Sequence, residues 1–247
     1  MGDFTSPHFR VGGVLGSSFR ILAANLPAFI LIPALALAPA IAAIGTGLWF
    51  DLFESSDAFL FAFAFVTAAL LSLVLCIVAR AAVIYGTFRH FTGQRLTLGD
   101  MFSNGLRHAW RVFSVGLVSE LLISLGYAFF LIPGLYLSTL YWVVMPAAVV
   151  EDSGVGDSLR RSSRLTDGCR WKIFGLLLVW SALQYLLENL PGALIDITDF
   201  HPAAVIVAWL AISLSVALGG IVDTVSYCRL RQIREGIGAD EIAAVFD

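Results

Sequence analysis

Residues 58–79, AFLFAFAFVTAALLSLVLCIVA, contain no charged side chain, and their only hydroxyl groups are those of Thr67 and Ser72. An α-helix rises about 1.5 Å per residue, so a segment of this length reaches across the roughly 30 Å hydrocarbon core of a bilayer. Of the 247 residues in the whole chain, 59% are hydrophobic and only 13% are charged. A soluble domain usually has about 25% charged residues and could not bury so much apolar surface. The sequence therefore predicts an integral membrane protein.

Apolar blocks of this kind recur along the chain, and we expect each to form a transmembrane helix. The six blocks are 26–50, 58–79, 112–131, 135–150, 173–195 and 202–222. The fourth block is the shortest and follows Pro133-Gly134, a turn signal, which predicts that blocks three and four form a helical hairpin. A re-entrant pair is the alternative for these two blocks. The predicted fold is all-α, with a single membrane domain over 1–247.

Positive charges lie on only one side of these blocks. All 15 Lys and Arg residues fall before block one, between blocks two and three, between blocks four and five, or after block six. The loops at 51–57 and 196–201 contain Asp or Glu and no Lys or Arg, and 132–134 is uncharged. Cytoplasmic loops of membrane proteins are enriched in Lys and Arg. The pattern therefore predicts six crossings with both termini in the cytoplasm.

Short amphipathic segments are predicted beside the spans on this cationic side. They are 9–22, 100–113 and 157–174. In the second segment Phe102, Leu106 and Trp110 share one face, whereas Arg107 and Arg111 lie on the other. Spacings of three and four residues are typical of amphipathic helices, and such helices lie at membrane interfaces. The alternative is that these segments only cap the helical bundle and set its topology.

The basic cytoplasmic face is the first candidate site. Its residues are Arg160, Arg161, Arg164, Arg170, Trp171, Lys172, Arg107 and Arg111. Each basic residue near an anionic membrane surface contributes about 1 kcal/mol to binding. We expect this face to bind anionic lipid headgroups, with a protein partner or a second copy of the chain as alternatives. No nucleic-acid partner is expected.

Ionisable residues at or within the apolar blocks provide two further candidates, because buried charge in a membrane is costly. Glu120 follows Arg111 along one predicted helix, at about 13 Å into the membrane. It is predicted either to form a structural hydrogen bond, for example with Tyr127, or to serve as a proton or substrate site. Arg80 and Asp223 lie at the cytoplasmic ends of blocks two and six and are predicted to form an ion pair.

Residue patterns typical of catalysis are not found. The 4 His and 3 Cys residues are scattered and lack the spacing of a metal site. The sequence contains no nucleophile elbow, phosphate-binding loop or dinucleotide-binding motif. We therefore expect no enzymatic activity, no catalytic residues, no cofactor and no bound metal.

The stretch 132–176, IPGLYLSTLYWVVMPAAVVEDSGVGDSLRRSSRLTDGCRWKIFGL, has the most distinctive pattern. Its features are Pro133-Gly134, Pro146, Glu151, the run Ser158-Leu159-Arg160-Arg161-Ser162, Gly168 and Arg170-Trp171. Together with the ending YCRLRQIREG at 227–236, this pattern resembles the YciC-like family of uncharacterised bacterial inner-membrane proteins. That family is similar to the membrane domain preceding some glycerophosphodiester phosphodiesterases. The resemblance implies a six-span bundle in the bacterial inner membrane and supplies no reaction, because no counterpart of the phosphodiesterases' soluble catalytic domain is found.

The predicted function is that of a non-enzymatic inner-membrane protein that acts through lipid or protein contacts of its basic cytoplasmic face. The alternative is a small transporter or exporter that uses Glu120 and a first span kinked by prolines. Those prolines are Pro27, Pro33 and Pro39. Broken helices line binding sites in some transporters, which supports this alternative.

Overall fold

A computed structural model describes residues 9–49, 58–91, 97–197 and 202–236, and all regular secondary structure in these ranges is α-helical, as predicted. The helices are α1 (Val11–Ala24), α2 (Leu26–Trp49), α3 (Ala58–Phe91), α4 (Leu98–Phe129), α5 (Leu131–Leu140), α6 (Val144–Val150), α7 (Val155–Thr166), α8 (Arg170–Ile197) and α9 (Pro202–Glu235). The acidic loop predicted at 51–57, and most of the one at 196–201, lie outside the described residues.

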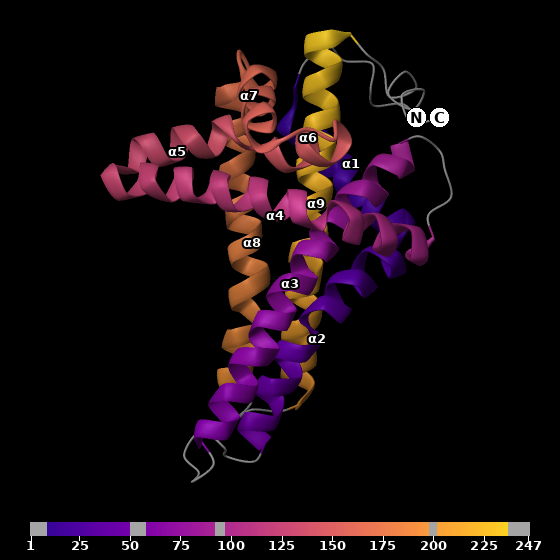
Figure 1. The fold of residues 1–247 in the computed structure, drawn as a ribbon, viewed down its shortest axis with the longest axis vertical. Helices are drawn as coiled ribbons and strands as arrows, with labels where there is room; N and C mark the ends of the chain where they lie inside the picture. The colour runs from indigo at the N-terminus through magenta and orange to yellow at the C-terminus, as the bar shows by residue number, and fades with distance from the viewer. Residues whose placement is uncertain (1–8, 50–57, 92–96, 198–201, 237–247) are drawn as a thin grey trace.

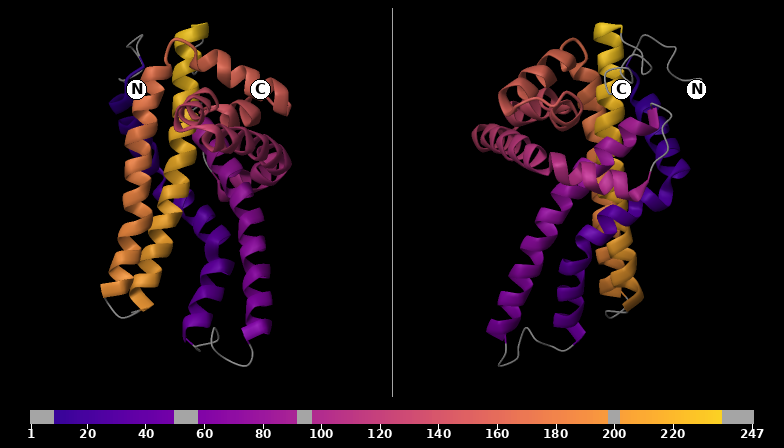
Figure 2. Two further views of the ribbon diagram at one scale, coloured as in Figure 1. Left: turned by 90° about the vertical axis from the view of Figure 1, so that its left-hand side faces the viewer. Right: turned by 45° about the vertical axis from the view of Figure 1, so that its right-hand side comes forward.

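Four long helices extend toward the same end of the molecule. α8 and α9 stand side by side along the long axis, and α2 packs against α3 beside them (Figure 1). The point where α2 gives way to α3 and the point where α8 gives way to α9 both lie at that end, here called the loop end (Figures 1 and 2). In the half of α3 near the loop end, the side chains of Phe59, Phe63 and Leu70 are each more than half exposed. Such a surface suits lipid and not water.

Five helical segments in the described part of the chain are long and apolar enough to cross a membrane. They are Leu26–Gly47, Phe59–Phe91, Leu98–Phe129, Leu131–Val150 and Val205–Glu235. These segments identify the chain as a membrane protein. The predicted span 173–195 lies in α8, which packs along α9. The side chains of α8 from residue 190 onward lie outside the described residues.

The third and fourth predicted spans form a hairpin that lies across the long helices. α4 and α5 run across α8 and α9 in Figure 1, and the left view of Figure 2 shows them nearly end-on. The predicted spans 112–131 and 135–150 therefore do not run alongside the other long helices, although the segments that contain them are long and apolar enough to cross a membrane. The 135–150 block is also divided, because a turn at Tyr141–Val143 separates α5 from α6. The predicted helix 100–113 is continuous with the 112–131 block as α4.

The turn of this crosswise hairpin lies at Phe130 and not at the expected Pro133-Gly134. Phe130 has an extended backbone, with φ −165° and ψ 158°, and α5 begins at the next residue. Pro133 therefore falls in the first turn of α5, where a missing N–H breaks no helical hydrogen bond. Gly134 permits close approach of the two helices, because a Cβ there would lie 2.3 Å from Cδ1 of Tyr127.

Small residues also permit α4 to cross α3 at close range. A Cβ on Gly105 of α4 would lie 2.8 Å from the carbonyl oxygen of Val78 on α3. Ala82 and Met101 are fully buried at this crossing. At about 1.5 Å per residue, Val78 lies about 30 Å along α3 from Ala58. The crossing therefore fixes the hairpin at about one hydrocarbon thickness from the loop end.

The buried core lies at the opposite end of the molecule, beside the hairpin and beyond it. Its largest fully buried side chains include Phe29 of α2, Leu165 of α7, Ile173 of α8, and Tyr227 and Leu230 of α9. The same end carries the arginines of α7 and α9. Packing among protein side chains is thus concentrated at the cation-rich end, whereas the loop end presents apolar side chains outward.

Candidate functional site

An open polar cavity of about 380 Å³ lies between the crosswise hairpin and the α8–α9 pair. Residues of α4, α8 and α9 form most of its wall, and α3, α5, α6 and the turn between α5 and α6 contribute the rest. Its charged lining residues are Arg80, Glu120, Glu188 and Asp223. The cavity is accessible from outside, because Glu120 and Glu188 are both exposed. The cavity therefore brings together Arg80, Glu120 and Asp223, which the sequence analysis identified. Glu188 also lines it.

Arg80 and Asp223 are in contact, as the sequence predicted. Arg80 Nη2 donates a hydrogen bond to Asp223 Oδ2 at 3.1 Å. The Asp223 side chain is 10% exposed and that of Arg80 is 41% exposed. The pair joins α3 to α9 and compensates one of the three carboxylates of the cavity.

Glu188 has only neutral hydrogen-bond donors. Its Oε1 accepts a hydrogen bond from Gln184 Nε2 at 2.9 Å and another from Ser215 Oγ at 3.1 Å. Ser215 lies on α9, so this carboxylate is held at the α8–α9 interface. No ion pair to Glu188 is found within the described ranges.

Glu120 lies on the cavity wall, and its carboxylate has no partner among the described residues. Among the described residues neither a hydrogen bond nor an ion pair to its carboxylate is found. Tyr127, the expected partner, has its hydroxyl 3.3 Å from Ser138 Oγ instead. Glu120 shares the cavity wall with the carboxylates of Glu188 and Asp223. Over the described residues, no donor is found for the structural hydrogen bond that the sequence offered as one alternative.

Aromatic and hydroxyl-bearing side chains complete the cavity. The aromatic lining residues are Tyr127, Tyr141, Trp142 and Trp180, and the serines are Ser119, Ser138, Ser181 and Ser215. The indole N–H of Trp142 is buried and has no hydrogen-bond acceptor in the described part of the chain. Over the same residues, no three His, Cys, Asp or Glu side chains come together as a metal site requires. The arrangement suits binding of a polar group.

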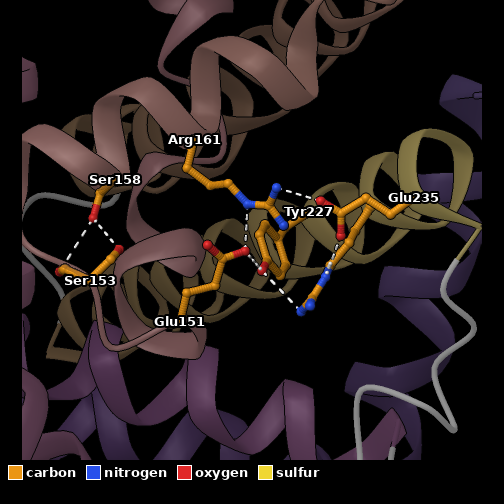
Figure 3. A network of polar contacts seen from close by, with 7 residues as sticks. Glu151, Ser153, Ser158, Arg161, Tyr227 and Glu235 are labelled. Atoms are coloured by element: carbon orange, nitrogen blue, oxygen red, sulfur yellow. Dashed lines mark hydrogen bonds and ion pairs between the residues drawn. The ribbon is translucent and has the colours of Figure 1, made fainter. Parts of the chain in front are cut away.

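A ring of polar contacts joins α6, α7 and α9 at the cation-rich end (Figure 3). Glu151 Oε1 accepts hydrogen bonds from Arg161 Nε and from the Tyr227 hydroxyl, each at 2.6 Å. Arg161 also pairs with Glu235, whose other oxygen accepts a hydrogen bond from Arg231 Nε at 2.9 Å. Arg231 closes the ring by donating to the Tyr227 hydroxyl at 3.4 Å. Each charged group in the ring has an opposite charge beside it.

This ring changes the interpretation of Arg161. Partial burial acts to lower the pKa of its guanidinium, but the hydrogen bonds and charges of Glu235 and Glu151 outweigh burial and raise that pKa. Arg161 is therefore permanently charged, and its charge is compensated inside the protein. The structure places this residue of the predicted basic face in a helix-joining contact.

The other residues of the basic face fall into two groups. Those with a carboxylate partner are Arg111 with Asp152, Arg160 with Asp157, and Arg170 with Asp167. Within the described residues, no ion pair or side-chain hydrogen bond is found for Arg107, Arg164 or Lys172. Trp171, beside Lys172, is 87% exposed. The cations that remain for a ligand are thus fewer than the sequence indicated.

A second cavity, of about 280 Å³, lies against α7. Its lining residues are Glu151, Ser153, Asp157, Arg160, Arg161 and Arg164. Three guanidinium groups face two carboxylates there, which leaves a net positive charge. Because Arg161 and Arg160 already have partners, Arg164 is the arginine of this cavity with charge to offer a ligand.

No protein-family model, no curated protein and no solved structure matches this chain. The resemblance to the YciC-like family therefore stays a prediction. What the two cavities can bind follows from their own geometry.

Sequence reasoning did not identify Glu188 or Tyr227 as site residues. Glu188 had a usable signal, because Gln184 and Glu188 are four residues apart and so share one face of an otherwise apolar helix. Tyr227 had none, since its role depends on Glu151 from a distant part of the chain.

Proposed function

We propose that the chain is a non-enzymatic integral protein of the bacterial inner membrane that binds anionic lipid at its cytoplasmic face. The observation that carries this proposal is the position of the crosswise α4–α5 hairpin. It crosses α3 at about one hydrocarbon thickness from the loop end, which is the level of the lipid headgroups. The cation-rich end beyond it is cytoplasmic by the positive-inside rule.

The proposed topology has four crossings, made by α2, α3, α8 and α9. From Pro202 to Asp223, α9 rises about 32 Å, which matches the distance along α3 to its crossing with α4. Both pairs of helices thus reach the interface at the same level. α4 and α5 then lie in the cytoplasmic interface, and the six-span alternative would require them to stand upright.

Exposed apolar side chains along α4 support this placement. Leu106, Trp110, Leu121, Leu125 and Phe129 are each more than half exposed. An interfacial helix buries such a face among the lipid chains while its charged face meets the headgroups. The hairpin therefore has the surface that lipid contact at this level requires.

The unpaired cations Arg107, Arg164 and Lys172 are the proposed headgroup contacts. At about 1 kcal/mol each near an anionic surface, together they would strengthen lipid binding about a hundredfold. Arg161 is excluded from this set because replacing it would break the ring of Figure 3.

Native mass spectrometry of the gently extracted full chain tests the proposal. We expect a stoichiometric phosphatidylglycerol molecule that is lost when Arg107, Arg164 and Lys172 are all replaced by Gln. The matched control exchanges Arg for Lys, and Lys for Arg, at the same positions and should retain the lipid. Equal lipid retention by the Gln triple variant and the wild type would refute this function.

Transport is a second candidate, favoured by the exposed position of Glu120 on the wall of an open cavity. Pro33 and Pro39 lie inside α2 as expected, but the described lining of that cavity includes no residue of α2. The test is proton flux into proteoliposomes, measured with an enclosed pH-sensitive dye. Transport through Glu120 predicts that Glu120→Gln abolishes the flux, and equal flux in both proteins rules it out.

A further inference from the structure

We propose that the 380 Å³ cavity between the crosswise hairpin and the α8–α9 pair is a binding site for an organic ammonium group. The site is separate from the cations that we propose to contact anionic lipid. The proposal requires no transport step, because a bound cation alone would compensate the carboxylates of Glu120 and Glu188.

The lining of the cavity carries more negative than positive charge. Three carboxylates face a single guanidinium, and that guanidinium is paired with Asp223. Glu188 receives hydrogen bonds only from neutral groups, and Glu120 receives none from the described residues. Carboxylates within a membrane or at its edge are costly without a compensating positive charge. The cavity therefore favours a cationic occupant.

Aromatic side chains in the lining favour an organic cation over a metal ion. Tyr127, Tyr141, Trp142 and Trp180 line the same cavity, and aromatic faces attract alkylammonium groups while shielding them from water. A bare metal ion would instead need several oxygen ligands converging on one point. No such convergence of three acidic, His or Cys side chains exists among the described residues.

Size and position agree with this ligand class. A cavity of about 380 Å³ is at the lower end of the range for small-molecule sites. It extends from Glu188, within the upright part of α8, to Asp223 at the level of the hairpin. An alkylammonium could come from a free amine in the cytoplasm or from the headgroup of an aminophospholipid in the inner leaflet.

Two probes distinguish these sources. The full chain is placed in phosphatidylglycerol nanodiscs, and binding of tritiated choline is measured by equilibrium dialysis against buffered potassium chloride. In the second arm the nanodiscs contain equal amounts of phosphatidylethanolamine and phosphatidylglycerol, and native mass spectra count the retained lipids. Saturable choline binding, one per chain, identifies a free-amine site. Stoichiometric retention of phosphatidylethanolamine identifies a headgroup site.

The variant Glu120→Gln/Glu188→Gln removes both uncompensated charges and preserves side-chain shape. Gln at 188 keeps an oxygen that can accept from Gln184 and Ser215, so the fold should persist. With whichever probe binds the wild type, we expect this variant to bind about tenfold more weakly or worse, because at least one charge contact is lost. Asp100→Asn, at an exposed carboxylate near the start of α4 and outside both cavities, is the matched control and should leave binding unchanged.

The proposal is overturned if neither probe binds, or if the double variant binds as well as the wild type. It is also overturned if phosphatidylglycerol is retained in place of phosphatidylethanolamine with the same dependence on Glu120 and Glu188. Replacing Arg107, Arg164 and Lys172 is expected to remove anionic lipid without changing ammonium binding in the cavity. The two proposals can therefore fail independently.

Discussion

The α2–α3 hairpin stands along the long axis of the molecule, whereas the α4–α5 hairpin lies across it (Figure 1). Both contain segments long and apolar enough to cross a membrane. They differ in where their charges fall. α3 has no charged residue from Ala58 to Ala79, whereas α4 has Arg107, Arg111 and Glu120 along its length. Hydropathy identifies helices that meet lipid, but the position of charges along a helix indicates whether it can stand upright.

The charge pattern of the loops cannot distinguish the two orientations. If the α4–α5 hairpin does not cross, two spans are lost together, and every other segment stays on the same side. The cations of α7, α8 and α9 stay on the predicted cytoplasmic side with six crossings or with four. The positive-inside rule thus predicts which side of the membrane each loop faces, but it does not determine whether the α4–α5 hairpin crosses.

The largest effect is expected where α7 is tied to α9 beside the crosswise hairpin. Arg161→Ala would leave Glu151 and Glu235 without their shared partner. Since these side chains are about a quarter exposed, the free energy of unfolding should fall by about 3 kcal/mol, the low end for buried pairs. Thermal unfolding in detergent measures it.

Combining Arg161→Ala with Glu151→Gln provides the control for that result. The two substitutions should destabilise the protein less than the sum of their separate effects, because both break the same contact. Strict additivity would mean that the ring of Figure 3 does not join these helices.

The crossing of α4 over α3 should give the next largest effect. Gly105→Ala would place a Cβ 2.8 Å from the Val78 carbonyl oxygen, and such overpacking costs about 2 kcal/mol. Gly99→Ala is the matched control in the same helix, because nothing lies within 4 Å of a Cβ there. Equal melting temperatures of the two variants would contradict the close crossing.

A smaller effect is expected at the ion pair between α3 and α9. Arg80→Ala and Asp223→Ala should show a coupling of about 1 kcal/mol in a double-mutant cycle, because the Arg80 side chain is partly exposed. Additive loss of thermal stability in the double variant would show that the pair contributes nothing to the packing of these helices.

The smallest effect on stability is expected for Glu120→Gln. Its carboxylate has no partner among the described residues, so the change in unfolding free energy should be within about 0.5 kcal/mol of zero. A loss comparable to that of Arg161→Ala, in the same thermal assay, would show that Glu120 is structural.

Local signals predicted the helices, their apolar blocks and the Arg80–Asp223 contact. The predicted segment 157–174 is divided, because α7 ends at Thr166 and Gly168 has φ +69° in the turn before α8. The crosswise orientation could not be predicted in this way, because it depends on the fit of Gly105 against Val78, far apart in the sequence. For the same reason Glu120 and Glu188 were not recognised as neighbours of one cavity.

The most direct test of the account is the side of the membrane on which the tip of the crosswise hairpin lies. Ile132→Cys is introduced after Cys76, Cys169 and Cys228 are replaced by Ala, and intact cells are treated with a membrane-impermeant maleimide. Ser55→Cys, in the acidic 51–57 loop, is the external control. The account predicts that Cys at 55 reacts from outside and Cys at 132 does not. Labelling of both from outside would contradict it and establish that the hairpin crosses the membrane.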